Sequence, residues 1–199
     1  MKVTDFELAR EIAYFMRRLY QQQLTTTSGG NISVRRGDEV FMTPGGTDKA
    51  RIETEDVGIL ALDGTLLTPG FKPTCEAELH LSIYRSRPDV NAIVHAHPVT
   101  ASAFAASGME ISTRLLAESD AVLGKIGRTP FFPFGTPELA EAAALCARDY
   151  DVFLLDNHGA AALGKTLLQA FDRLEVLENA AKVTLICEQL MAGKARYIP

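Results

Sequence analysis

Two histidines, His95 and His97, close a short run of small and β-branched residues, AIVHAHP (92–98). In a β-strand, side chains two residues apart point to the same face, so both imidazoles would project side by side at the strand's carboxyl end. Pro98 cannot donate to a ladder and marks where the strand stops. Paired neutral imidazoles are typical ligands of zinc and similar borderline metals. The pair therefore favours a metal site at a strand end.

A third histidine and a glutamate could complete such a site. His158 ends another apolar run and is followed by Gly159. Glu76 stands near the start of a helix predicted over residues 74–86, where unpaired backbone N–H groups favour a carboxylate. His80 lies on the same helix face and could join the site, but a helical histidine followed by apolar residues favours a packed role. Three histidines and one glutamate make a metal centre the leading hypothesis.

Two glycine-rich turns, SGGN (28–31) and Gly45-Gly46, have two interpretations. They are either ordinary turns, in which glycine supplies a positive φ, or sites that present backbone N–H groups to a phosphate, helped by the amide of Asn31. Neither turn matches G-x-G-x-x-G or a P-loop, so a nucleotide site is not expected. Cys75 is interpreted as a small residue lining a site, because only its place at a helix start could lower the pKa of the thiol.

Composition limits the class of protein. The 199 residues are 47% hydrophobic and 23% charged, which predicts one domain over residues 1–199. The net charge of −5 argues against a nucleic-acid partner, and an anion would have to be bound locally by backbone amides or a metal. Three cysteines without a C-x-x-C motif suit a reducing compartment. The charged N-terminal stretch lacks a signal-peptide core, and no apolar run approaches the ~20 residues of a membrane span, so we expect a cytoplasmic protein.

Helices and hairpins along the chain must position these residues. Apolar residues recur at helical spacing or alternate as in half-buried strands. Helices are predicted over residues 4–22, 74–86, 99–106, 138–148 and 167–191, and strands over 32–35, 39–42, 57–62, 90–95, 152–155 and 160–163. Residues 114–123 are helical or irregular, and residues 129–137 are an aromatic, proline-rich connector. Hairpins mixed with helices indicate an α/β fold with a mixed sheet flanked by helices.

Taken in order, these motifs resemble those of the class II aldolase/adducin-head family, most closely its L-fuculose-1-phosphate aldolase branch. The matching segments are SGGNISVR (28–35), MTPGG (42–46), KPTCE (72–76), VNAIVHAHP (90–98) and LLDNHG (154–159). With helices on both sides, the resemblance covers nearly the whole chain. It implies a three-layer α/β/α sandwich around a mixed, largely antiparallel sheet. It also implies a homotetramer with active sites at subunit interfaces. The apolar face of the last helix is either part of the core or part of such an interface.

The resemblance also assigns roles to individual residues. It implies that His95, His97 and His158 bind a catalytic Zn²⁺, for which Mn²⁺ or Co²⁺ could substitute, and that Glu76 is the catalytic acid and base. The residues that fall on the family's phosphate-holding positions are Ser28, Gly30, Asn31, Gly45, Gly46, Thr74 and Cys75. The implied reaction cleaves a ketose 1-phosphate into dihydroxyacetone phosphate and an aldehyde through an enediolate on the metal.

The chain departs from the family pattern at two places. Thr74-Cys75 replaces a serine pair, which removes one hydroxyl donor from the phosphate site. No tyrosine occurs in residues 111–120, where aldolases of this branch often have a proton donor from the neighbouring subunit; Glu118 falls near that position.

Three alternative functions follow. Glu118 keeps open a 5-methylthioribulose-1-phosphate dehydratase. Glu76 argues against a pentulose-phosphate epimerase, which has aspartate at that position. A non-catalytic adducin-like binding module would be expected to lack some of the four metal-site residues, and this chain has all of them.

Overall fold

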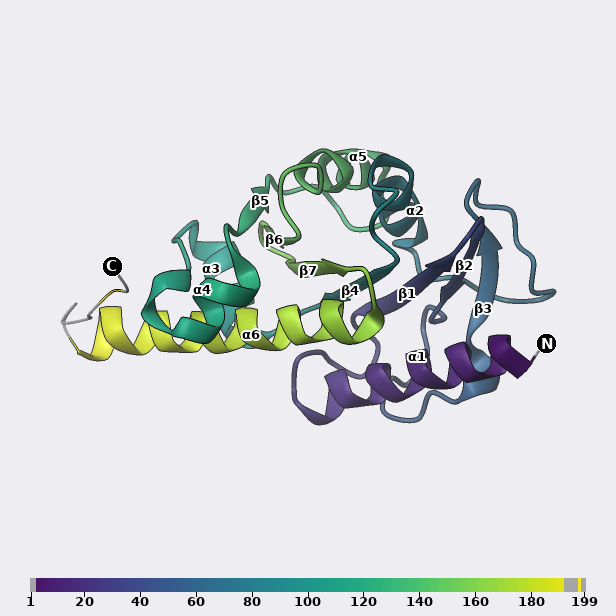
Figure 1. Cartoon of the computed structure of the whole chain (residues 1–199), viewed down its shortest axis with the longest axis horizontal. Helices are drawn as coiled ribbons and strands as arrows, with labels where there is room; N and C mark the ends of the chain where they lie inside the picture. Colours follow the sequence, from purple (N-terminus) through teal and green to yellow (C-terminus); the bar gives the residue numbers. More distant parts are fainter. Residues whose placement is uncertain (1–2, 192–196, 198–199) are drawn as a thin grey trace.

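A seven-stranded sheet forms the middle layer of the molecule in this computed structural model, which describes residues 3–191 and 197 (Figure 1). The strands are β1 (Asn31–Arg36), β2 (Glu39–Met42), β3 (Gly58–Ala61), β4 (Ala92–Ala96), β5 (Gly127–Thr129), β6 (Val152–Leu155) and β7 (Gly159–Gly164). Their order is β3-β2-β1-β4-β7-β6-β5. All neighbouring strands are antiparallel except β5 and β6, which are parallel. The predicted mixed, largely antiparallel sheet is confirmed.

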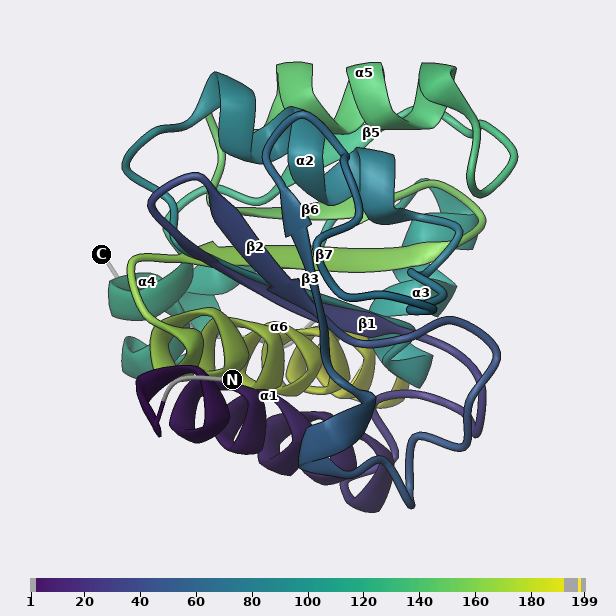
Figure 2. The same cartoon turned by 90° about the vertical axis from the view of Figure 1, so that its right-hand side faces the viewer.

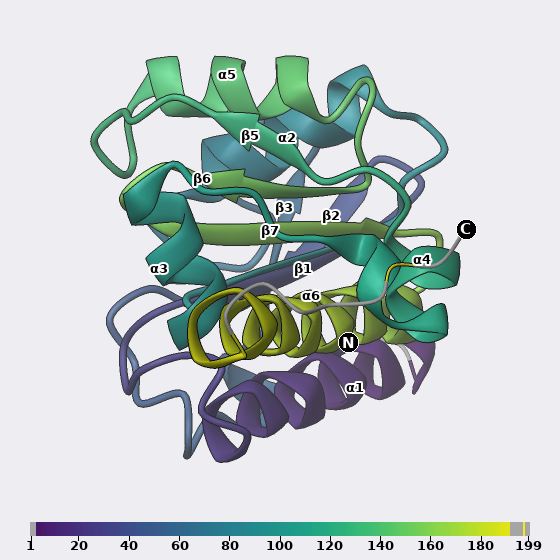
Figure 3. The same ribbon diagram turned by 90° about the vertical axis from the view of Figure 1, so that its left-hand side faces the viewer.

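Helices cover both faces of this sheet. They are α1 (Val3–Gln21), α2 (Ala77–Ser86), α3 (Val99–Ser107), α4 (Ala117–Leu123), α5 (Pro137–Cys146) and α6 (Leu167–Leu185), with short helical turns η1 (Thr54–Asp56), η2 (Thr113–Leu115) and η3 (Ile186–Leu190). Figure 2 shows α2 and α5 on one side of the sheet and α1 and α6 on the other. Figure 3 shows that α3 and α4 lie beside α6. The three-layer α/β/α architecture is confirmed.

Strand alternation divides the buried apolar residues into two cores. On β4, Ala92, Val94 and Ala96 belong to the core beneath α1 and α6. Ile93 belongs to the core beneath α2 and α5. His95 has the same parity as Ile93, so the pleat turns it toward the α2 side. That is the side on which Glu76 precedes α2.

The structure differs from the sequence predictions at three elements. Strand β5 is absent from the predicted set, because three residues are too few for a periodic pattern. The second helix begins at Ala77, not at residue 74, so Glu76 occupies the N-cap position, with φ −99°. The last helix is an α-helix to Leu185 and continues as a π-helical turn, η3, to Leu190, so the prediction of a helix to about Met191 missed only the change to π-helical geometry. Within 114–123, Ala117–Leu123 is helical.

The register of the sheet determines where the histidines lie. Strand β4 runs antiparallel to both its neighbours, so its carboxyl end lies beside the first residues of β1 and β7. His95 pairs with Asn31 of β1 on one side and with Ala161 of β7 on the other. Within the described residues, no helix is long and apolar enough to cross a membrane.

Candidate metal centre and substrate pocket

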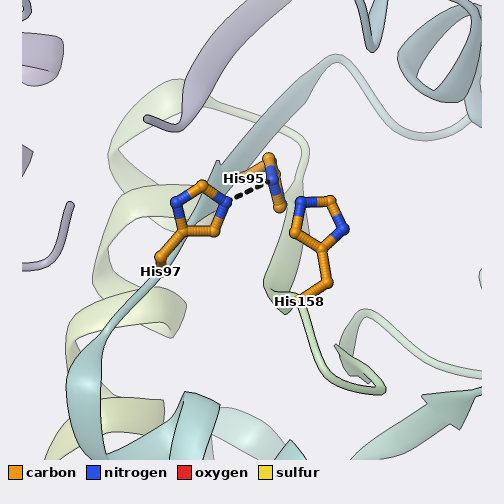
Figure 4. Close-up of side chains that lie close together, drawn as sticks. All are labelled: His95, His97 and His158. Carbon is orange, nitrogen blue, oxygen red and sulfur yellow. Dashed lines mark hydrogen bonds between the residues drawn. The ribbon is translucent and has the colours of Figure 1, made fainter. Parts of the chain in front are cut away.

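His95, His97 and His158 lie together at this edge of the sheet (Figure 4). One ring nitrogen from each lies within 4.8 Å of the others. The ring centroids are 4.9 Å apart for His95 and His97, 4.9 Å for His95 and His158, and 5.2 Å for His97 and His158. His158 comes from the tight turn between β6 and β7, in which Asn157 adopts a left-handed φ of 56°. Asparagine tolerates this conformation better than most residues.

Glu76 lies against two of these histidines, His95 and His158. Its Oε2 lies 3.2 Å from Nε2 of His95, and its Oε1 lies 3.3 Å from Nε2 of His158. Asn31 donates a hydrogen bond from Nδ2 to Oε2 at 2.9 Å, which fixes the orientation of the carboxylate. Glu76 is buried, with 6% of its surface exposed. A buried carboxylate is stable only when it is paired and hydrogen-bonded in this way.

A second set of hydrogen bonds orients the candidate ligands and Glu76. The Nδ1–H of His95 donates to the carbonyl of Ala160 at 3.0 Å, so its Nε2 is the nitrogen that faces the centre. Asn31 uses its amide N–H groups on Glu76 and Thr74, so its Oδ1 accepts from Nε2 of the fully buried His80 at 2.5 Å. His80 is therefore a packed residue that orients Asn31, as its apolar surroundings predicted.

The protonation of the centre follows from burial and mutual contacts. Burial, together with the neighbouring His95 and His158, lowers the pKa of His97 to about 3. Burial, together with His95, lowers the pKa of His158 to about 4. Burial opposes the charge on Glu76, but His95, His158 and Asn31 outweigh it and hold the pKa of Glu76 far below its usual value. At neutral pH, His97 and His158 are thus neutral and Glu76 is ionised.

Two glycines enclose the ring of His97. A Cβ at Gly29 would lie 2.8 Å from Nδ1 of His97, and a Cβ at Gly159 would lie 2.6 Å from its Cδ2. Neither distance is compatible with a real side chain, so only glycine lets this imidazole take its place. The SGGN motif is compatible with an ordinary turn or a phosphate-binding turn, but packing of Gly29 against His97 carries no sequence signal of its own.

The donor set fits a divalent metal ion. Nε2 of His95 and Nε2 of His97 are 3.2 Å apart, close to the roughly 3.4 Å that a tetrahedral ion with ~2.1 Å bonds imposes on its ligands. Oε1 of Glu76, which lies 3.3 Å from Nε2 of His158, is buried and accepts no hydrogen bond within the described part of the chain. Neutral imidazoles and a carboxylate that converge in this way are stabilised by a shared cation.

A cavity of about 330 Å³ opens onto this centre. It is lined by all seven predicted phosphate-site residues together with Glu76, His97 and His158, while His95 is fully buried behind them. The remaining wall residues, which the sequence reasoning did not select, are Gly29, Lys49, Phe134 and Asn157. The structure thus brings the two glycine turns, the turn before α2 and the histidines to one cavity.

Glu118 lies elsewhere in the chain. It is in the first turn of α4 and lines a separate hollow together with Gln22, Glu175 and other residues of α6. Within one chain the structure does not bring Glu118 to the metal centre. Its predicted role therefore requires a second subunit.

Comparison with known proteins agrees with this geometry. Residues 10–185 match the model of the family described as class II aldolase and adducin N-terminal domain. The chain is 41% identical over 170 residues to an L-fuculose phosphate aldolase of Methanocaldococcus jannaschii, covering 85% of this chain and 91% of that protein. It is 31% identical to a 3-oxo-tetronate 4-phosphate decarboxylase of Haemophilus influenzae, covering 98% and 94%.

A solved structure extends the comparison to three dimensions. The crystal structure of L-fuculose-1-phosphate aldolase from Thermus thermophilus superposes with a TM-score of 0.83 at 28% identity, covering 98% of this chain and 100% of that one. Sequence and architecture therefore agree over almost the entire length. With its family match, its α/β/α fold and its histidine triad, the chain belongs to the class II aldolase and adducin N-terminal domain family.

Proposed function

We propose that the chain is a metal-dependent aldolase that cleaves a ketose 1-phosphate similar to L-fuculose 1-phosphate into dihydroxyacetone phosphate and an aldehyde. The observation that carries the proposal is the contact of Glu76 with His95 and His158 on the wall of a cavity lined by two glycine turns. This arrangement combines a proton-transfer group, a candidate metal site and two glycine turns of the kind that can present backbone N–H groups to a phosphate.

The roles within the centre follow from the contacts. We assign His95, His97 and His158 as ligands of a divalent ion, with Zn²⁺ as the first candidate because three imidazoles leave it an open position. When bound, the ion supplies Lewis acidity to the carbonyl and hydroxyl oxygens of the sugar. The hydrogen bond that His95 donates to Ala160 and the two glycines around His97 hold these imidazoles in position.

Glu76 handles the proton at C3. Because its neighbours keep the carboxylate ionised, it can remove a proton from the hydroxymethyl carbon of dihydroxyacetone phosphate in the direction of synthesis. In the direction of cleavage the carboxylate accepts the proton of the C4 hydroxyl as the C3–C4 bond breaks, and the same carboxyl group then delivers that proton to C3 and ends ionised. Asn31 keeps the carboxylate aimed during both steps.

The glycine turns hold the phosphate at a distance from the reacting carbons. Ser28, Gly30, Gly45 and the pair Thr74-Cys75 lie on the same cavity wall as the metal centre. Backbone N–H groups and hydroxyls there would bind the phosphate and orient C3 and C4, which lowers the entropic part of the barrier. The N–H of Gly45 is the exception, because it donates to the carbonyl of Lys72. We further propose a cytoplasmic homotetramer in which Glu118 of a neighbouring chain completes the site.

A second reaction has a specific observation behind it. The relative that is 31% identical is a 3-oxo-tetronate 4-phosphate decarboxylase, and loss of CO₂ beside a ketone also breaks a carbon–carbon bond and leaves negative charge next to a carbonyl. The same metal site and the same glutamate could support it. The dehydratase and epimerase alternatives differ in that they release no aldehyde and no CO₂.

A product assay separates these reactions. The metal-loaded protein is incubated with a panel of ketose 1-phosphates and with a phosphorylated 3-oxo acid, and dihydroxyacetone phosphate, aldehyde, CO₂ and epimerised sugar are measured. Dihydroxyacetone phosphate and aldehyde in equal amounts support the proposal. Release of CO₂ from the 3-oxo acid without any aldol cleavage would replace it by the decarboxylase.

A further inference from the structure

Lys49 is a buried cation on the wall of the substrate cavity. Only 1% of its surface is exposed, and it is the one lysine or arginine among the described residues that line this cavity. Its Nζ donates a hydrogen bond to the carbonyl of Pro44 at 2.5 Å and a long one to Oγ1 of Thr47 at 3.4 Å. Two of its three N–H bonds are thus directed at the loop that carries Gly45 and Gly46.

This charge has no acidic partner in the described part of the chain. No salt bridge there includes Lys49, and Glu76, the carboxylate in the same cavity, is engaged with His95 and His158. Burial without a counter-ion lowers the pKa of Lys49 to about 8, against a small opposing effect of the Cys75 thiol. A buried ammonium with neutral partners alone is costly, and an anion bound in the cavity would remove that cost.

Lys49 also connects the three loops that form the anion-binding wall. Its backbone N–H donates to Thr27 at 2.8 Å, beside the first glycine turn, while its Nζ holds the second turn at Pro44. The second turn is joined to the segment before α2, since Gly45 donates to the carbonyl of Lys72 at 3.1 Å. The ammonium group therefore lies at the base of the loops to which the substrate phosphate is assigned.

We propose that Lys49 is a substrate-binding residue whose ammonium group pairs with the phosphate of the sugar phosphate. This inference rests on the proposed function for the nature of the substrate, but the anion site itself can be tested without turnover. Backbone amides bind a phosphate by dipoles alone, whereas a dianion in a cavity of a protein with net charge −5 gains a full positive charge from Lys49.

The pairing has a pH dependence of definite sign. The anion binds to the protonated lysine, so the contribution of Lys49 to affinity is fully present below the pKa of free Lys49 and is lost as the pH rises above about 8. The other titratable groups on the cavity wall are Cys75, Glu76, His97 and His158. The two histidines and Glu76 do not change charge in this range, because their pKa values lie far below it. Cys75 lies on the same cavity wall, so Cys75→Ser is included in the test.

The test measures the binding of inorganic phosphate to the metal-loaded protein by calorimetry. Lys49→Met removes the charge and keeps the length, and Lys72→Met is the matched control, since the Lys72 side chain is exposed and does not line the cavity. Loss of one charge-assisted hydrogen bond predicts about 10- to 100-fold weaker binding for Lys49→Met, and no change for Lys72→Met. Affinity of the wild type and of Cys75→Ser should fall by up to about tenfold per pH unit above about pH 8, and that fall should vanish in Lys49→Met.

Each outcome decides the matter. Equal affinity and the same pH profile in Lys49→Met would show that Lys49 only connects loops and does not bind the anion. A wild type that binds no phosphate would refute the anion site itself. If Lys49→Met fails to fold, the decision rests on the wild type, in which phosphate should raise the melting temperature less at about pH 9 than at about pH 7. Phosphate binding that depends on Lys49, in a protein that forms no dihydroxyacetone phosphate, would refute the proposed aldol reaction and leave this inference standing.

Discussion

Asn31 lies directly opposite His95 in the ladder between β1 and β4, and its side chain donates a hydrogen bond to Glu76 at 2.9 Å. One strand pairing thus sets the distance between a candidate metal ligand and the proposed acid–base group. Proton transfer loses efficiency when its groups move by an ångström, so this pairing is a functional element of the sheet. It leads to the first of four predictions.

Replacement Glu76→Gln should separate catalysis from metal binding. The glutamine keeps the size of the side chain and removes the titrating group, so turnover should fall by about 100- to 10,000-fold. Metal content should remain close to one ion per chain, because three imidazoles still hold it. Activity is measured by dihydroxyacetone phosphate release and metal by elemental analysis. Glu78→Gln is the matched control, since Glu78 is exposed and pairs with Arg85; a fully active Glu76→Gln would place the acid–base group elsewhere.

Replacement Gly159→Ala should lower metal occupancy without altering any ligand. The new methyl group would lie 2.5 Å from the carbonyl of Ala96 and 2.6 Å from the ring of His97, so the imidazole must move away. We expect a substoichiometric metal content and a loss of about 1–3 kcal/mol in the free energy of unfolding. Gly37→Ala is the control: Gly37 has φ 63° in open space, so it costs stability through backbone strain alone. Full metal occupancy in Gly159→Ala would show that the close packing of glycine against His97 is not needed for metal binding.

The metal-free protein should lose stability as the pH falls from about 6.5 to about 4. The pKa of His97 is about 3 in the folded chain, against ~6.5 when unfolded, so the unfolded state binds the extra proton over this range. The free energy of unfolding should fall by up to about 1.4 kcal/mol per pH unit for this residue. His80, with a pKa of about 3, adds to the same slope.

His95, the other histidine at the strand end, does not reverse this pH dependence of the free energy of unfolding. The pKa of His95 is raised, so His95 is protonated in both states below about pH 6.5 and contributes a constant term. Urea unfolding in the presence of a chelator, at several pH values, measures the slope. His97→Asn should make it shallower by about one proton. A wild-type stability that is flat over this range would contradict the assignment of His97 as neutral.

Glu118 should act from a neighbouring subunit. If so, Glu118→Gln lowers turnover, and mixed oligomers of Glu118→Gln and Glu76→Gln chains regain part of it, because some sites then receive both intact glutamates. Light scattering should show a tetramer. Glu175→Gln, which alters another acidic side chain of the same hollow, serves as the control. An active monomer, or mixtures with no recovered activity, would remove Glu118 from the site.

Much of the architecture could be predicted from local patterns. The H-x-H pair follows from the two-residue period of a strand, and His95 and His97 do lie with ring centroids 4.9 Å apart. The antiparallel sheet follows from hairpin turns between short alternating segments. In contrast, the parallel partner of β6 spans only Gly127–Thr129, and tertiary pairing with no periodic signal of its own places it in the sheet.

The candidate site was predictable where the residue type itself carries the chemistry. Histidine and glutamate side chains are typical metal ligands and acid–base groups, and the ordered motifs pointed to the glycine turns that line the same cavity. Lys49 could not be selected, because a lysine in a polar turn is indistinguishable in sequence from a solvated one; its burial arises from three loops that meet only in the folded chain. Gly29 was missed for a similar reason, since its contact with His97 joins segments far apart in sequence.

The position of His95 between Asn31 and Ala161 has a kinetic consequence. The centre exists only after strands separated by more than half of the chain have come together, and such non-local pairings form late and slowly. Isolated fragments should therefore bind the ion weakly, and ion capture in a refolding experiment should report completion of the central ladder, not the earlier appearance of helices. A bound ion would then stabilise the completed sheet, and it would slow unfolding more than it accelerates folding.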